Sequence, residues 1–193
     1  MSHKLITHLQ EYLGAHIEKI SPNTQAVSDE VSHHPYDMLA QAAVPAVLVA
    51  FYKFTRTEDG VKEIIADNGK RPPFDYLLGD KTMEVVKRVA EYAKVTEVQA
   101  DEVLDTVADE CLRFVRNDLG SAFTPERLQL YFADQRQSIL RYLPEDLQMG
   151  ELLNDSTIDD RTNKMEGPAS GLAKMIQDLF SSPGMEKKNV SEW

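Results

Sequence analysis

The stretch that decides the fold is MLAQAAVPAVLVAFY, residues 38–52, in which no side chain is charged. It is 15 residues long, whereas a helix needs roughly 20 to cross a bilayer. Asp37 and Lys53 close it at its two ends. We therefore predict a helix over about 36–54, buried in the core of a soluble protein. Because proline removes a helical hydrogen bond, we expect a kink or break near 42–44, ahead of Pro45.

Outward from this stretch, apolar residues recur at three- and four-residue steps along most of the chain. No segment alternates with a period of two, so we expect essentially no sheet. The spacing predicts helices at about 2–20, 26–31, 57–69, 83–93, 96–120, 124–143 and 144–153. The predicted helix over 124–143 has a polar middle, residues 133–138, and we expect that it can break there. The predicted fold class is all-α, an irregular bundle of eight or nine helices, and two similar halves remain an open alternative.

The helix over 96–120 is the best defined. Thr96 and Gln99 have the spacing of a capping box, and Gly120 is a natural stop. Asp109 and Arg113 have the spacing of an ion pair on the helix surface. A carboxylate row, Asp101, Glu102, Asp105 and Asp109, faces away from the apolar stripe, so we predict that it is solvated. The stripe itself consists of Ala100, Val103, Leu104, Val107, Ala108, Cys111, Leu112 and Val115.

The predicted domain organisation is one helical domain over 1–153, with 1–69 and 74–153 as its possible halves. The polar stretch 154–171 is predicted to be a linker, and 172–193 a C-terminal helix with a tail. This tethered helix has a one-sided apolar face and is the predicted interaction helix. It either docks on its own domain or inserts into the groove of a partner protein. The residues of this face are Leu172, Met175, Ile176, Leu179 and Phe180.

When the sequence is aligned with itself at an offset of 65 residues, similar patterns coincide, which indicates a possible internal repeat. This shift aligns Leu13-Gly14 with Leu78-Gly79, and it aligns the apolar helix over 38–52 with the one over 96–120. Any two amphipathic helices can be aligned in this way, so both explanations stay open.

The second half carries a family resemblance. Leu77-Leu78-Gly79-Asp80, then Val85-Val86 to Ala93, and then Val95-Thr96 before an apolar helix resemble the YidB-like family of small bacterial proteins. Ala43-Val44-Pro45-Ala46 is similar to the Leu-Pro-type step of that family. The resemblance covers about 9–115, and it departs from the family in lacking glycine-rich stretches and in having Asp109-Glu110 where a proline is typical. It implies an all-helical bacterial protein of unassigned function, and it carries over no catalytic residue.

Composition narrows the possible functions. The net charge is −11, with 21 basic and 32 acidic residues, and the segment 58–120 alone has 9 basic and 15 acidic side chains. Because phosphate contacts need a basic surface, we expect no nucleic-acid binding. A helix-turn-helix at Val95-Thr96 is disfavoured for the same reason, since its second helix begins with acidic residues. A single cysteine and no secretory signal favour the cytoplasm, and we expect no membrane association.

Candidate chemistry is sparse. Glu30, His33 and His34 have a spacing that occurs in metal-binding helices, so they are the candidate metal ligands. A second such pair is missing from the sequence, and His33-His34-Pro35 also fits a helix end. The oxygen-rich stretch 154–160 lacks the central glycine and terminal glutamate of a calcium loop. Cys111 is predicted to be an inert core thiol, His16 a core histidine and His8 a surface one.

We expect no catalytic residue and no cofactor. The leading hypothesis is a non-enzymatic protein that acts through helix-mediated protein–protein contact, with an unidentified protein partner or by self-association. The alternative is an enzyme, or a binder of a small ligand or metal, with a pocket between helices.

Overall fold

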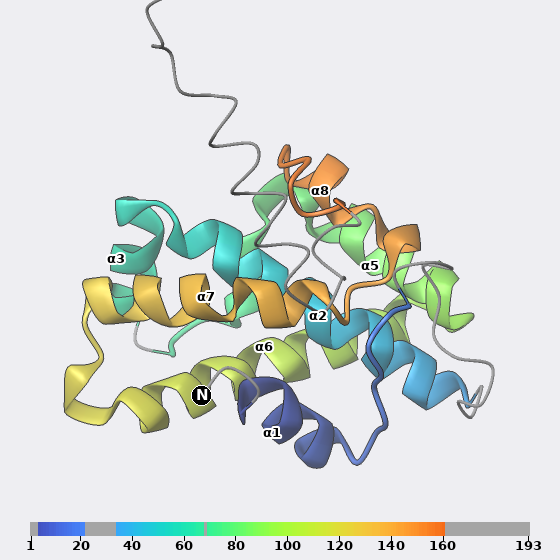
Figure 1. Cartoon of the computed structure of the whole chain (residues 1–193), viewed down its shortest axis with the longest axis horizontal. Coiled ribbons are helices and arrows are strands. Elements are labelled where there is room, and N and C mark those ends of the chain that lie inside the picture. Colours follow the sequence, from blue (N-terminus) through green and yellow to red (C-terminus); the bar gives the residue numbers. More distant parts are fainter. Residues whose placement is uncertain (1–3, 22–33, 68, 161–193) are drawn as a thin grey trace, which may run out of the picture.

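The structure is a computed structural model that describes residues 4–21, 34–67 and 69–160 (Figure 1). In chain order its helices are α1 Lys4–Leu13, α2 Pro35–Thr55, α3 Glu58–Asp67, α4 Pro73–Leu77, α5 Thr82–Ala93, α6 Glu97–Leu119, α7 Pro125–Leu140 and α8 Met149–Leu152. Short 3-10 turns lie at Gly79–Lys81, Gly120–Ala122 and Glu145–Leu147. Within the described part of the chain there is no strand, so the predicted all-α bundle is confirmed. The helices predicted near 26–31 and 172–180 lie outside the described residues.

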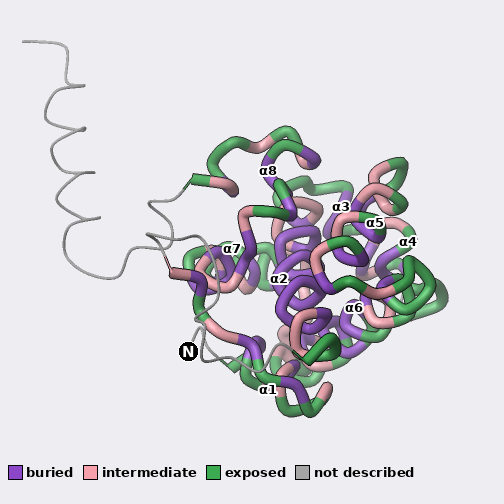
Figure 2. The backbone as a smooth tube through the Cα atoms, turned by 90° about the vertical axis from the view of Figure 1, so that its right-hand side faces the viewer, coloured by how far each residue is buried: buried purple, intermediate pink, exposed green. Residues whose placement is uncertain are grey.

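Helix α2 is the centre of the bundle. It packs most extensively against α5, α6 and α7, and every residue from Leu39 to Phe51 is buried, as the tube of Figure 2 makes visible. Gln41 is the polar residue within this run, and its amide is fully used. Its nitrogen donates to the carbonyls of Glu18 (3.0 Å) and Tyr142 (2.8 Å), and its oxygen accepts from the Glu18 backbone N–H (2.7 Å). Burial therefore costs this amide little.

The length and composition of α2 would allow it to cross a membrane. However, 78% of its most apolar window is buried inside the bundle. Such burial is typical of the core helix of a soluble protein, as predicted from residues 38–52.

Of the kink or break expected ahead of Pro45, the break is wrong, because α2 continues as one helix from Pro35 to Thr55. A proline inside a helix costs about 3 kcal/mol. Complete burial of the surrounding run outweighs that cost, since each large apolar side chain that leaves water contributes roughly 1.5–3 kcal/mol. The break expected at 133–138 in α7 is wrong for a related reason: the polar Gln135 and Ser138 are themselves buried within the continuous helix.

Helix α1 is shorter than predicted. It ends at Leu13, where Gly14 takes the left-handed conformation (φ +62°) that closes many helices. The following residues run as a non-helical segment in which Ala15, Ile17 and Ile20 are buried. The Ile20 backbone N–H donates to the Arg141 carbonyl at 2.7 Å. Apolar residues of this segment continued the helical spacing by chance, and this lengthened the prediction to residue 20.

The predicted caps of α6 are confirmed, and two further threonines cap the starts of α3 and α7. Thr96 and Gln99 form the capping box at the start of α6, and Gly120 is its C-cap. The Thr57 hydroxyl accepts from the Gly60 backbone N–H at 3.0 Å, and the Thr124 side chain caps α7 with Pro125 as its first residue.

Residues 155–159, which we name the strap, fasten the end of the described chain to the bundle. The Asp155 carboxylate binds Lys53 (3.3 Å) and Arg56 (2.9 Å) of the α2 end, and Ile158 is buried. Asp159 accepts from the first backbone N–H groups of α8, those of Gly150 (2.9 Å) and Glu151 (3.0 Å). The first residues of the predicted linker thus pack on the domain, and 161–171 lie outside the described residues.

The proposed repeat aligns two features of like geometry. Gly14 and Gly79 both have positive φ angles, +62° and +56°, and each follows the end of a short helix. The same shift places α2 opposite α6, and these two long helices contact each other. The two-halves hypothesis stays a prediction, supported by these correspondences.

Candidate functional site

The predicted metal ligands are only partly described. Glu30 and His33 lie outside the described residues, whereas His34 is the N-cap of α2, where its Nδ1 accepts from the Tyr36 backbone N–H at 3.3 Å. The described ranges contain no group of three side chains that would hold a metal. The interaction-helix residues Leu172, Met175, Ile176, Leu179 and Phe180 lie outside the described residues as well.

Two histidines differ from their predictions. His16, predicted in the core, lies in the segment after α1 with its side chain 65% exposed and bonded to Glu18 (3.1 Å). His8, predicted on the surface, is 29% exposed and stacks on Phe114 with ring centroids 4.2 Å apart. The early end of α1 explains the first error, since His16 follows the turn at Gly14.

A buried ionic cluster joins α1 to α6, and sequence reasoning missed its central residue. Glu110 is 3% exposed and accepts from His8 Nε2 at 2.5 Å and from Nε and Nη2 of Arg113, each at 2.6 Å. Burial raises the pKa of Glu110, but the hydrogen bonds from Arg113 and His8 outweigh it, so the pKa lies below its usual value. The predicted Asp109–Arg113 ion pair is wrong, because Arg113 turns to this buried partner instead.

The carboxylate row of α6 is mostly solvated. Asp101, Glu102 and Asp109 are exposed, as predicted. Asp105 is half-buried, and burial together with the charge of Asp101 raises its pKa to about 6. On the opposite face Cys111 is fully buried, and burial raises the pKa of its thiol, which makes it a poor nucleophile.

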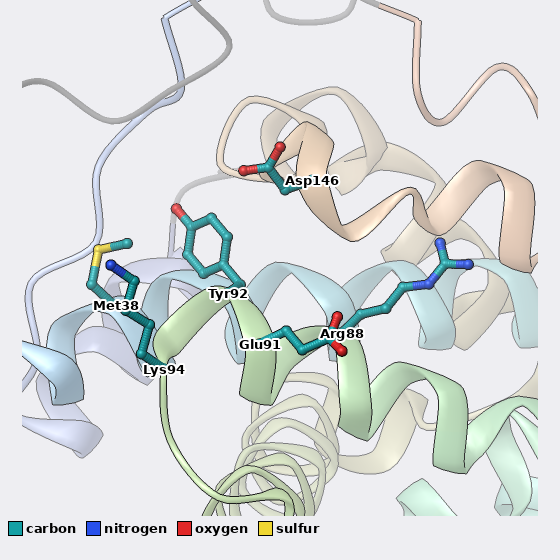
Figure 3. Close-up of a pocket in the computed structure, with 6 residues that line it drawn as sticks. All are labelled: Met38, Arg88, Glu91, Tyr92, Lys94 and Asp146. Carbon is teal, nitrogen blue, oxygen red and sulfur yellow. The ribbon is translucent and has the colours of Figure 1, made fainter.

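A cleft of about 410 Å³ lies where α5 meets the turn at Glu145–Leu147 (Figure 3). Figure 3 shows Met38 and Lys94 at one end, Tyr92 and Asp146 in the middle, and Arg88 at the other end. Arg88 is committed to the fold, because it donates to Glu84 (3.0 Å) and to the Leu147 carbonyl (3.1 Å). Burial and the nearby Asp146 raise the pKa of Tyr92 to about 12, so the Tyr92 hydroxyl remains a hydrogen-bond donor at neutral pH.

Lys94 and Asp146 are the charges of this cleft that are available to a ligand. Neither makes an ion pair within the described part of the chain. Lys94 sits in the left-handed region (φ +56°) at the C-cap of α5, where it ends the helix and borders the cleft. Lys94 and Asp146 carry opposite charges on the two sides of the Tyr92 hydroxyl, so a small zwitterion could pair with both of them.

A second cavity, of about 390 Å³, lies along α7, and we name it the α7 cavity. Its apolar part comes from Leu119, Leu130 and Tyr131. The Oε1 atom of Gln135, a residue 5% exposed, accepts no hydrogen bond in the described structure. Four charged residues complete the lining: Lys4, Asp118, Arg127 and Asp134.

These charged residues of the α7 cavity make no ion pair with one another or elsewhere in residues 4–21, 34–67 and 69–160. Burial raises the pKa of Tyr131 to about 12, and a hydrogen bond from Gln135 opposes that rise. The cavity thus combines an apolar floor with charges of both signs that make no ion pair within the described residues.

Comparison with family models, with curated proteins and with solved structures finds no match to this chain. The sequence had singled out none of the cavity residues as a site. Arg127, Leu130, Tyr131 and Asp134 do recur at three- and four-residue spacing, but the same spacing describes any helix face, so it could not separate this surface from the core.

Proposed function

We propose that this chain is a soluble, cytoplasmic bacterial bundle that acts without catalysis, through helix-mediated protein–protein contact. Its partner is another protein or a second copy of the chain. The contact is made by the apolar face of the interaction helix: Leu172, Met175, Ile176, Leu179 and Phe180.

The observation that carries this proposal is that the core of the described bundle is already enclosed. Helix α2 is buried from Leu39 to Phe51 against α5, α6 and α7. The strap then fastens the chain at Asp155 and Asp159. An additional one-sided apolar segment beyond this point is therefore available for contacts other than covering α2.

The resemblance to the YidB-like family enters here as part of the proposal. The left-handed glycines of the two Leu-Gly turns, Gly14 and Gly79, support the shared structural plan that the resemblance implies. This plan is one of architecture, so it supports a non-catalytic role without specifying a partner.

The test is affinity capture with the full chain from cells that make it. We expect a defined partner to be captured by the wild type, to be lost with Ile176→Asp, and to be retained with Met83→Asp. Met83 is the matched control because it is an exposed apolar residue (67%) on α5, away from the predicted contact face. The captured protein must then bind the purified wild-type chain directly. Retention after Ile176→Asp, or turnover of a substrate by the purified chain, would contradict the proposal.

A second candidate function is the binding of a small zwitterion in the cleft of Figure 3, favoured by the unpaired Lys94 and Asp146 beside Tyr92. Thermal unfolding with free amino acids as probes tests it. Stabilisation by the amino acid should be lost in Lys94→Ala and kept in Lys87→Ala, which changes a lysine of α5 outside the cleft.

The hypothesis of a metal bound by Glu30, His33 and His34 is tested by elemental analysis of protein purified without an affinity tag.

A further inference from the structure

The outer face of α7 has an order of charge that a partner helix can match. Arg127, Leu130, Tyr131 and Asp134 have the i, i+3, i+4, i+7 spacing of residues that share one face of a helix. The basic residue lies nearer the start of α7 and the acidic one nearer its end. Leu130, between them, is 54% exposed. An exposed leucine in a cavity between two unpaired opposite charges favours an amphipathic helix as the occupant.

The chain leaves the described structure next to α7, on the side of the helix away from this face, because Arg136 lies about 200° around the helix from Asp134. In the strap, the carbonyl and hydroxyl of Thr157 accept from Arg136 at 2.9 and 3.0 Å, and Arg136 lies two residues beyond Asp134 on α7. From Arg136 back to Leu130 the helix spans about 9 Å, at 1.5 Å per residue. The twelve residues from Asp160 to Leu172 reach up to about 40 Å. The interaction helix is therefore within reach of the α7 cavity.

We propose that the segment 172–180 of the same chain docks in the α7 cavity, antiparallel to α7. This inference rests on the proposed function, in which the same segment is the contact helix. A chain that leaves near Arg136 enters the cavity at its Asp134 end and runs towards Arg127. The segment carries Lys174 before Asp178, so this direction places the lysine at Asp134 and the aspartate at Arg127. The apolar face then covers Leu119, Leu130 and Tyr131.

The tether decides between the chain's own segment and a second copy. The twelve residues from Asp160 to Leu172 tether the segment to the domain, and a tether of this length gives an effective concentration on the order of millimolar. That concentration exceeds ordinary protein concentrations, so the tethered segment occupies the cavity in preference to the segment of another molecule. The docked state is consequently a closed form, and a partner that binds the interaction helix has to displace it from α7.

Disulfide trapping in the full chain tests the docking. The native Cys111 is fully buried, so it does not compete for an added thiol. We expect the variant with Leu130→Cys and Ile176→Cys to close an intrachain disulfide about tenfold faster than the control with Met83→Cys and Ile176→Cys, because docking raises the local thiol concentration. Circular dichroism confirms that both variants are folded. Equal rates in the two variants, or disulfides formed between chains, would overturn the proposal.

A charge exchange tests the direction of docking. In the Leu130→Cys, Ile176→Cys background, Asp134→Lys should slow intrachain trapping several-fold by placing a lysine against Lys174. Adding Lys174→Asp should restore it. The matched control is Asp80→Lys, an exposed aspartate outside the α7 cavity, which should leave the rate unchanged. If the second substitution restores nothing, the antiparallel pairing is wrong.

This test is independent of the partner. Rapid trapping without any captured partner would sustain the docking and contradict the proposed function. Absence of trapping, with a partner still captured through Ile176, would contradict the docking and support the proposed function.

Discussion

Helices α2 and α6 are the two long helices of the bundle, and they differ in how much of their surface is buried. Helix α2 is uncharged from Met38 to Tyr52 and is buried on all sides from Leu39 to Phe51. Helix α6 is buried along one stripe and presents acidic side chains to water on the other. The comparison teaches that composition identifies a central helix, whereas periodicity identifies a peripheral one.

Their buried polar residues differ in the same way. Gln41 of α2 is neutral and bonds to backbone groups of the segment after α1 and of the chain after α7. Glu110 of α6 is charged, and its buried carboxylate accepts hydrogen bonds from the side chains of His8 and Arg113. The central helix therefore fixes loops through a neutral amide, and the peripheral helix fixes α1 through an ionic cluster.

The largest effect is expected in the core of α2. Phe51 is fully buried and stacks on Phe132 with ring centroids 5.1 Å apart. Phe51→Ala should lower the free energy of unfolding by about 3–5 kcal/mol, because it removes apolar contact and leaves a cavity. Val98→Ala on α6, where the side chain is 67% exposed, should change it by less than about 0.5 kcal/mol. Urea denaturation measures both, and similar losses would remove the distinction between the helices.

The ionic cluster of α6 should give the next largest effect. Glu110→Ala leaves His8 and Arg113 without their shared acceptor, and we expect a loss of about 2 kcal/mol at pH 7. This is below the usual cost of breaking a fully buried pair, because Arg113 is 61% exposed and can be hydrated.

The pH dependence of this loss has a definite sign. The folded-state pKa of Glu110 is lowered, so the stabilisation is present above its unfolded value of about 4.5 and disappears as the pH falls below it. The difference between wild type and Glu110→Ala, measured by denaturation at several pH values, should therefore shrink in acid. A constant difference would show that Glu110 acts through packing alone.

Asp105 should show the opposite sign. Its folded-state pKa is raised to about 6, so ionisation disfavours the folded state and stability is lost as the pH rises from about 4 to about 6. Asp105→Asn should stabilise the protein by about 1 kcal/mol at neutral pH and by nothing in acid, a value reduced for partial solvation. Glu102→Gln, at an exposed position of the same helix, is the control. Equal gains at both pH values would contradict the assignment.

The smallest contrast is expected between the helix starts. Thr96→Ala removes one half of the capping box of α6 and should cost about 1 kcal/mol. His34→Ala at the start of α2 should cost less than about 0.5 kcal/mol, because its cap bond is long (3.3 Å) and Pro35 already fixes the first helical residue. Thermal unfolding of the two variants side by side measures the difference.

Sequence reasoning predicted the fold well where local chemistry decides the structure. The capping box at Thr96, the stop at Gly120 and the uncharged core helix are local features, and each is found as predicted. The path of the segment after α1 and the continuity of α7 depend instead on which residues meet distant partners. Ile20 is held by Arg141, and no spacing within either segment encodes that bond.

The candidate sites were harder to predict for the same reason. Glu110 stands beside the polar face of α6 in sequence, and only the position of His8, 102 residues away, explains its burial. The α7 cavity combines side chains from α1, α6 and α7. Such a site depends on tertiary packing, whereas the predicted metal ligands came from a local motif.

The burial of α2 also has a consequence during synthesis. The helix ends at Thr55, but α7, which covers one of its sides, is complete only at Leu140, 85 residues later. At about 5–20 residues per second, the uncharged helix stays partly uncovered for roughly 4–17 seconds while the rest of the chain is made. The nascent chain therefore displays its most aggregation-prone segment first, and its production depends on translation speed and chaperone supply more than that of a bundle whose core helix is made last.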